Sequence, residues 1–70
     1  MSHDDQLQKA VLAELNWEPS ITASHIGVTA QNGTVKLTGT VSSWPDRRTA
    51  ALTAWGAPGT KSVENDLIVA

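Results

Sequence analysis

Residues 26–41 read IGVTAQNGTVKLTGTV, in which two alternating runs flank the dipeptide Asn32-Gly33. Asn-Gly between such runs predicts a β-hairpin, because a type I′ turn requires positive φ at both central residues. A two-residue turn also fixes the register, so each strand presents one apolar face and one threonine-rich face. Gly39 falls on the apolar face, where the missing side chain would let a helix approach closely. The hairpin is the element around which the rest of the fold is predicted.

The segment before the hairpin predicts an amphipathic helix over residues 4–17. Its apolar residues recur at spacings of three and four, and they are Leu7, Ala10, Val11 and Leu15. Asp4 and Asp5 suit the first turn, where carboxylates meet the positive end of the helix dipole. Pro19 ends the helix, and Trp17 before it is expected at the edge of the core or as a staple.

A second helix is predicted after the hairpin, because residues 42–46 combine a capping serine with a proline and an aspartate. This helix is expected to run to Trp55 and to end at Gly56. Its expected apolar side consists of Ala51, Ala54 and Trp55, with Leu52 beside them, and Trp55 is expected in the core. Arg47 and Arg48 fall in the first turn, where positive charge opposes the dipole, so their placement needs another reason.

Residues 60–69 predict a third strand with an apolar face of Val63, Leu67 and Val69. Asn65 interrupts that face, which indicates either a bulge or a side-chain hydrogen bond to neighbouring backbone. A strand–helix–strand connection joins parallel strands. We therefore expect an α+β fold, a two-layer sandwich of order α-β-β-α-β, with a three-stranded mixed sheet and both helices on one face. Residues 1–70 would form this single domain.

The composition excludes several classes of function. The chain has no cysteine, which excludes disulfides and thiolate chemistry. Its net charge is -2, with seven acidic against five basic residues, which argues against a dedicated nucleic-acid binder. The threonine-rich face of the sheet also lacks the aromatic residues on which RNA bases stack.

The sequence predicts neither a targeting segment nor a membrane-spanning segment within these residues. No stretch approaches the roughly 18 apolar residues of a membrane span, and no basic-then-apolar leader is present. As written, the chain would be cytoplasmic, whereas a domain excised from a longer envelope protein would be periplasmic or envelope-associated.

Few side chains suit catalysis or metal binding. His25 precedes a strand and has no cysteine or tyrosine to pair with, and no serine or aspartate lies in a glycine-flanked nucleophile elbow. His3 could form a copper site with the amino terminus, but removal of Met1 before Ser2 would shift it out of register. The glycines form no phosphate-cradling loop. The sequence therefore predicts a protein that is not an enzyme and has no metal, cofactor or small-molecule substrate.

Two spaced motifs carry a resemblance that spans nearly the whole chain. The first consists of Gly33, Val35, Leu37 and Gly39, and the second consists of Gly59, Val63, Asn65, Leu67 and Val69. On these residues the chain resembles the BON domain, a small bacterial module named after an osmotic-shock periplasmic protein and nodulation proteins. Thr60 departs from the pattern, where valine is usual. The resemblance makes Gly33, Gly39, Gly59 and Asn65 structural hallmarks.

The resemblance implies a binding module without catalytic residues. BON domains are described as phospholipid- or membrane-associating modules, often in tandem or attached to other domains. The first hypothesis is therefore association with phospholipid surfaces. The alternative is a protein-interaction or oligomerisation module without lipid affinity, which would use the open sheet face or pair at an exposed strand edge.

Trp44, Arg47 and Arg48 are the candidate lipid-binding residues. Trp44 is expected in a loop with both arginines within one turn, and together they would form an interfacial anchor. The alternative is that Trp44 folds over the helix start as a hydrophobic staple and that the arginines are simply solvated. Each arginine would add only about 1 kcal/mol near an anionic surface, so this association would be weak and salt-sensitive.

Overall fold

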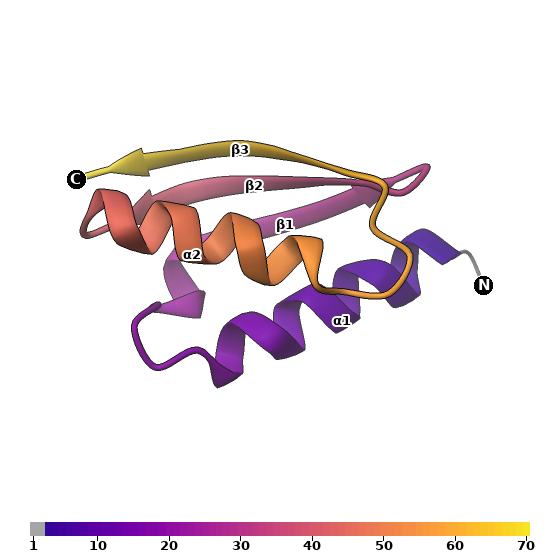
Figure 1. Cartoon of the computed structure of the whole chain (residues 1–70), viewed down its shortest axis with the longest axis horizontal. Helices are drawn as coiled ribbons and strands as arrows, with labels where there is room; N and C mark the ends of the chain where they lie inside the picture. The colour runs from indigo at the N-terminus through magenta and orange to yellow at the C-terminus, as the bar shows by residue number, and fades with distance from the viewer. Residues whose placement is uncertain (1–2) are drawn as a thin grey trace.

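Three strands form a mixed sheet, with one helix before the hairpin and one after it (Figure 1). In the computed structural model, which describes residues 3–70, the elements follow in the order α1 (His3–Trp17), a 3₁₀ turn η1 (Ala23–His25), β1 (Ile26–Gln31), β2 (Thr34–Val41), α2 (Trp44–Trp55) and β3 (Ser62–Val69). The central strand β2 is antiparallel to β1 and parallel to β3. The predicted α+β class, the order α-β-β-α-β and the mixed sheet are confirmed.

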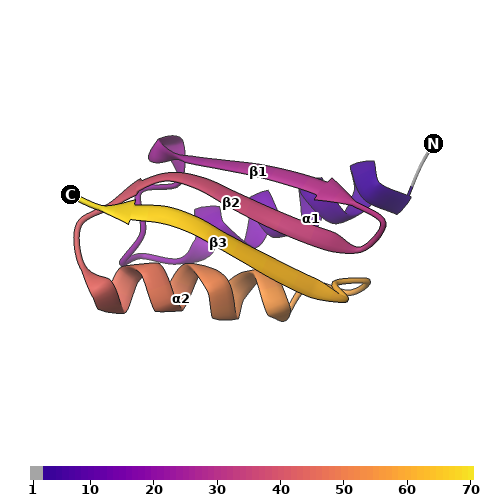
Figure 2. The ribbon, with the colours of Figure 1, turned by 90° about the horizontal axis from the view of Figure 1, so that it is seen from above.

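One cluster of apolar side chains joins the sheet to both helices. The helix α1 contributes Leu7, Val11 and Leu15, whereas α2 contributes only Ala50 and Ala54. The strands add Ile26, Val28, Val35, Leu37, Val41 and Leu67. The helix α1 packs on β1, α2 packs on β3 and β2, and the helices contact each other (Figure 2). These contacts favour the arrangement with both helices on one face of the sheet.

The hairpin turn has the geometry that its sequence predicts. Asn32 has φ 53° and Gly33 has φ 82°, the two positive values that a type I′ turn needs. Gln31 pairs with Thr34 across the turn. Along both strands the valine, leucine and isoleucine side chains are buried, whereas the threonine-rich face is exposed except at the half-buried Thr34, as alternation requires.

Gly39 is required by a close contact, but not by the one that the sequence suggests. Its φ of +112° lies where L side chains are strained, and a Cβ there would collide with the carbonyl oxygen of His25. The backbone that approaches Gly39 therefore belongs to η1, just before β1. The expectation that a helix approaches this glycine is wrong, because Ile26 pairs with Gly39 and brings the preceding turn against it.

The helix α2 has the serine cap and the end that its sequence predicts, but it turns a different face to the core. The hydroxyl of Ser43 caps it by accepting a hydrogen bond from the backbone N–H of Asp46, at 3.2 Å. Ala50 and Ala54 are fully buried, whereas Trp55 is 50% exposed. The prediction of Trp55 in the core is wrong. Residues 50 and 54 share a face, and residue 55 lies a further 100° round the helix.

Trp17 also lies outside the core, with 84% of its surface exposed. The buried face of α1 is made of Leu7, Val11 and Leu15, which are spaced four residues apart. Trp17 follows Leu15 by two residues, which turns it to the far side of the helix. Its predicted role at the edge of the core is therefore wrong.

The strand β3 begins at Ser62, two residues later than predicted. The side-chain hydroxyl of Thr60 donates to the carbonyl of Ala54 in the last turn of α2 at 2.9 Å, and this carbonyl also accepts from the N–H of Ala57. The N–H of Lys61 donates to the carbonyl of Gly33 at 2.8 Å. The loop is therefore attached both to the end of α2 and to the hairpin turn.

Gly39→Ala is expected to lower the free energy of unfolding by about 3 kcal/mol or more, because positive φ and a backbone collision combine. Gly59→Ala is the matched control. Gly59 has φ +96° but nothing lies within 4 Å of an added Cβ, so a loss of only about 1 kcal/mol is expected. Urea unfolding of both variants measures the difference, and equal losses would contradict the role given to the His25 contact.

Candidate functional site

The exposed side of α2 carries large apolar side chains. Five exposed residues, here called the outer face of α2, are Trp44, Pro45, Arg48, Leu52 and Trp55. Trp44 is 70% exposed, Leu52 60% and Trp55 50%. A helix that packs on a sheet normally presents polar residues to solvent. Here α2 buries alanines and exposes tryptophan and leucine, which indicates a contact surface.

The outer face of α2 is an elongated strip along one side of the helix. Trp44 and Trp55 are 11 positions apart, so a rise of 1.5 Å per residue places their backbones about 16 Å apart. Arg48 and Leu52 lie between them, and no carboxylate shares the strip. The surface thus has two amphipathic indole rings, an apolar centre and one positive charge.

Trp44 is the first residue of α2 rather than part of a loop. The guanidinium carbon of Arg47 lies 5.7 Å from the centroid of its ring, within the range of a cation–π contact. The contact holds one side of the indole while most of its surface stays open to solvent.

The two adjacent arginines have different environments. Arg47 is half-buried and donates from Nε to the carbonyl of Leu67 at 3.0 Å and from Nη2 to the carbonyl of Asn65 at 2.6 Å. Arg48 is exposed on the outer face. A positive charge in the first turn of α2 opposes the helix dipole. The hydrogen bonds of Arg47 to β3 explain why an arginine is nevertheless placed there.

Asn65 completes the contact between α2 and β3 from the other side. Its Nδ2 donates to the carbonyl of Arg47 at 3.0 Å, and its Oδ1 accepts from the N–H of Leu67 at 3.3 Å. The pairing of β2 with β3 runs through Leu37 and Asn65 without interruption. Of the two expectations for this residue, the side-chain hydrogen bond to backbone is confirmed and the bulge is wrong.

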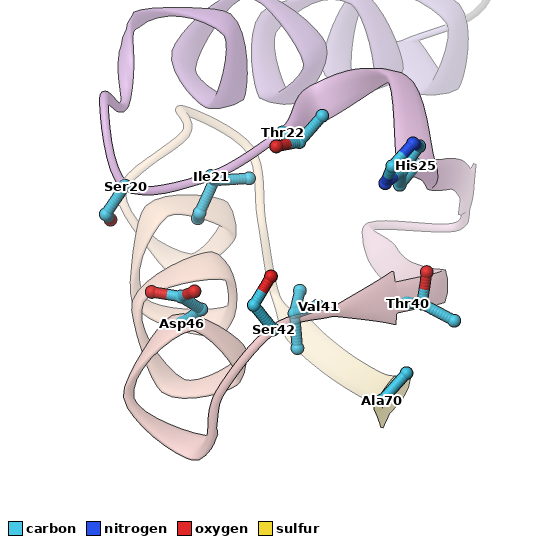
Figure 3. Close-up of a pocket in the computed structure, with 9 residues that line it drawn as sticks. All are labelled: Ser20, Ile21, Thr22, His25, Thr40, Val41, Ser42, Asp46 and Ala70. Carbon is cyan, nitrogen blue, oxygen red and sulfur yellow. The ribbon is translucent and has the colours of Figure 1, made fainter.

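A polar pocket of about 230 Å³ lies where the ends of β2 and β3 meet the start of α2. Its polar side chains include His25, Asp46 and several hydroxyls, but His25 and Asp46 lie on opposite sides of it (Figure 3). Within residues 3–70, no group of three or more metal-binding side chains occurs. The copper site considered for His3 would need Met1 and Ser2, which lie outside the described residues. No described helix has the length and hydropathy needed to cross a membrane.

A comparison with protein-family models finds the BON domain model over residues 3–70. The chain belongs to the BON domain family. No curated protein sequence matches the chain. Membership identifies the chain as a binding-type domain, of a family not known for catalysis.

The four positions that the resemblance marks as hallmarks have structural explanations. Gly33, Gly39 and Gly59 all have positive φ, between +82° and +112°, which glycine adopts without a steric penalty. Asn65 joins β3 to α2. Thr60, where the family pattern has valine, uses its hydroxyl to bond the last turn of α2.

The sequence did not predict that Leu52 and Trp55 of the outer face are exposed, because it placed them on or beside the apolar side of the helix. The sequence signal for their exposure was the pair Ala50 and Ala54. Their four-residue spacing places two small side chains on one face, which can therefore lie close to the sheet. On a helical wheel that face lies opposite Leu52, so the exposed position of the leucine follows from the choice of the alanine pair.

Arg47→Ala is expected to lower the free energy of unfolding by about 2 kcal/mol, since two charge-assisted hydrogen bonds to β3 are lost. The matched control is Arg48→Ala, for which a change within about 0.5 kcal/mol is expected at an exposed position. Thermal and urea unfolding distinguish the two variants. If Arg48→Ala proved as destabilising as Arg47→Ala, the hydrogen bonds to Asn65 and Leu67 would not be the cause.

Proposed function

We propose that residues 1–70 form one non-enzymatic binding module that associates with phospholipid surfaces through the outer face of α2. The observation that carries the proposal is the exposure of every aromatic side chain. The chain has three tryptophans and no phenylalanine or tyrosine, and all three tryptophans are at least half exposed. Two of them lie on one strip with Leu52 and Arg48, and tryptophan beside arginine suits the interface of a bilayer.

The candidate residues take different roles in this proposal. Trp44 and Arg48 contact the lipid surface directly, together with Leu52 and Trp55. Arg47 acts as a positioning residue, because its guanidinium bonds to the carbonyls of β3 and lies against the ring of Trp44.

The apolar side chains supply most of the proposed binding free energy. Fully burying a large apolar side chain contributes about 1.5 to 3 kcal/mol, and three such residues on the outer face are at least half exposed. Arg48 adds about 1 kcal/mol near an anionic surface. Partial insertion of the strip therefore outweighs the charge contribution.

Self-association through a strand edge has less support, because helix side chains bond to both edge strands. Gln31 and Thr34 flank the two-residue turn and exchange both of their backbone hydrogen bonds. Hydrogen-bonded and non-hydrogen-bonded pairs alternate along an antiparallel ladder, so Val28 belongs to a non-hydrogen-bonded pair and its carbonyl points away from β2. Gln8 of α1 donates to this carbonyl at 2.8 Å. Arg47 bonds to two carbonyls of the other edge strand, β3. On the open sheet face, Lys36 already pairs with Asp66, at 3.7 Å.

Fluorescence titration tests the proposed surface. In the Trp17→Phe variant, only Trp44 and Trp55 emit, and a blue shift is expected when small vesicles of phosphatidylcholine and phosphatidylglycerol are added. Adding Leu52→Ser to this variant is expected to weaken binding about fivefold, which corresponds to about 1 kcal/mol.

Ile68→Ser in the same background is the matched control, because Ile68 is 64% exposed on β3 and lies away from α2. It is expected to keep the affinity unchanged. Equal weakening by Leu52→Ser and Ile68→Ser, or the absence of any blue shift, would contradict binding through the outer face of α2.

A further inference from the structure

The charges around the outer face of α2 bear on the kind of lipid surface that it would bind. The five basic residues of the chain are Lys9, Lys36, Arg47, Arg48 and Lys61. Within residues 3–70, Arg48 is the basic residue that lies exposed on this face, because Arg47 bonds to β3 and the three lysines belong to α1, to β2 and to the loop before β3. The outer face therefore has too little free positive charge to recognise an anionic surface.

The remaining charges oppose attraction to anionic lipid. The chain has a net charge of -2, and Asp46 lies half-buried in the first turn of α2, two positions before Arg48. An anionic membrane repels a negatively charged protein over a Debye length, which is about 8 Å at physiological ionic strength. One exposed arginine does not reverse this repulsion.

The apolar part of the outer face is bulky and extended. Trp44 and Trp55 lie about 16 Å apart along the helix with Leu52 between them, so all three side chains meet a surface when α2 lies parallel to it. Helices that bind in this way depend on curvature, because gaps between the headgroups of a curved bilayer admit large side chains.

On the basis of the proposed function, we infer that this BON domain selects neutral, strongly curved phospholipid surfaces. Trp44, Leu52 and Trp55 insert between the headgroups, and the negative charge of the lipid is not what the domain recognises. Binding of this kind persists in salt, because apolar burial is not screened.

Vesicle flotation of the full chain tests this inference, with small and large vesicles of pure phosphatidylcholine and of phosphatidylcholine with phosphatidylglycerol. Each is measured at about 0.1 M and about 1 M salt, which shortens the Debye length from about 10 Å to about 3 Å. Strong binding to small phosphatidylcholine vesicles is expected at both salt concentrations, with weaker binding to large ones. Leu52→Ser is expected to weaken binding to small phosphatidylcholine vesicles about fivefold, which lowers the floated fraction, and the control Ile68→Ser is expected to leave it unchanged.

Three other outcomes would overturn the inference, and they can be told apart. Binding only to vesicles with phosphatidylglycerol, lost at high salt, would show that anionic headgroups are recognised and would leave the proposed function standing. Binding to small and large phosphatidylcholine vesicles alike would remove the dependence on curvature. Flotation with none of the vesicles would overturn the proposed function as well.

Discussion

The orientation of α2 depends on the reciprocal hydrogen bonds between Arg47 and Asn65. Arg47 donates from its side chain to two carbonyls of β3, and Asn65 donates from its side chain to the carbonyl of Arg47. These bonds fix both the height of the helix along the strand and its rotation about its own axis. With that rotation fixed, Ala50 and Ala54 lie in the core and the tryptophans of α2 lie outside.

The helices are attached to the sheet by polar side chains as well as by apolar packing. Edge strands leave backbone groups unpaired, and a helix side chain bonds to one carbonyl of β1 and to two carbonyls of β3. Gln8 of α1 serves β1, and Arg47 of α2 serves β3. Both helices therefore contribute polar contacts beyond the core, which matters in a domain whose α2 buries only two alanines.

The sequence was sufficient to predict the elements and their order, because Asn32-Gly33, the serine–proline start of α2 and Gly56 are local signals. It was not sufficient to predict which large residues are buried. Trp55 is apolar, but the close approach of α2 to the sheet has room only for small side chains, and spacing alone did not reveal that distance. Trp17 is also apolar, but it lies on the side of α1 opposite the buried residues. Trp44 and Arg48 of the candidate site were identified from residue type. The role of Arg47 depends on carbonyls 18 and 20 positions further along the chain, which no local pattern indicates.

The inner face of α2 has small side chains and its outer face has large ones, so selection for folding and selection for binding act on different residues. Substitutions at Ala50 or Ala54 change the packing volume between helix and sheet, so folding restricts them. Substitutions at residues 48 and 52 do not change the packing of the core, since these side chains are exposed. Copies of this domain can therefore diverge in what the outer face contacts while the fold stays the same. In tandem or fused arrangements, such divergence would let neighbouring copies of one scaffold acquire different binding preferences.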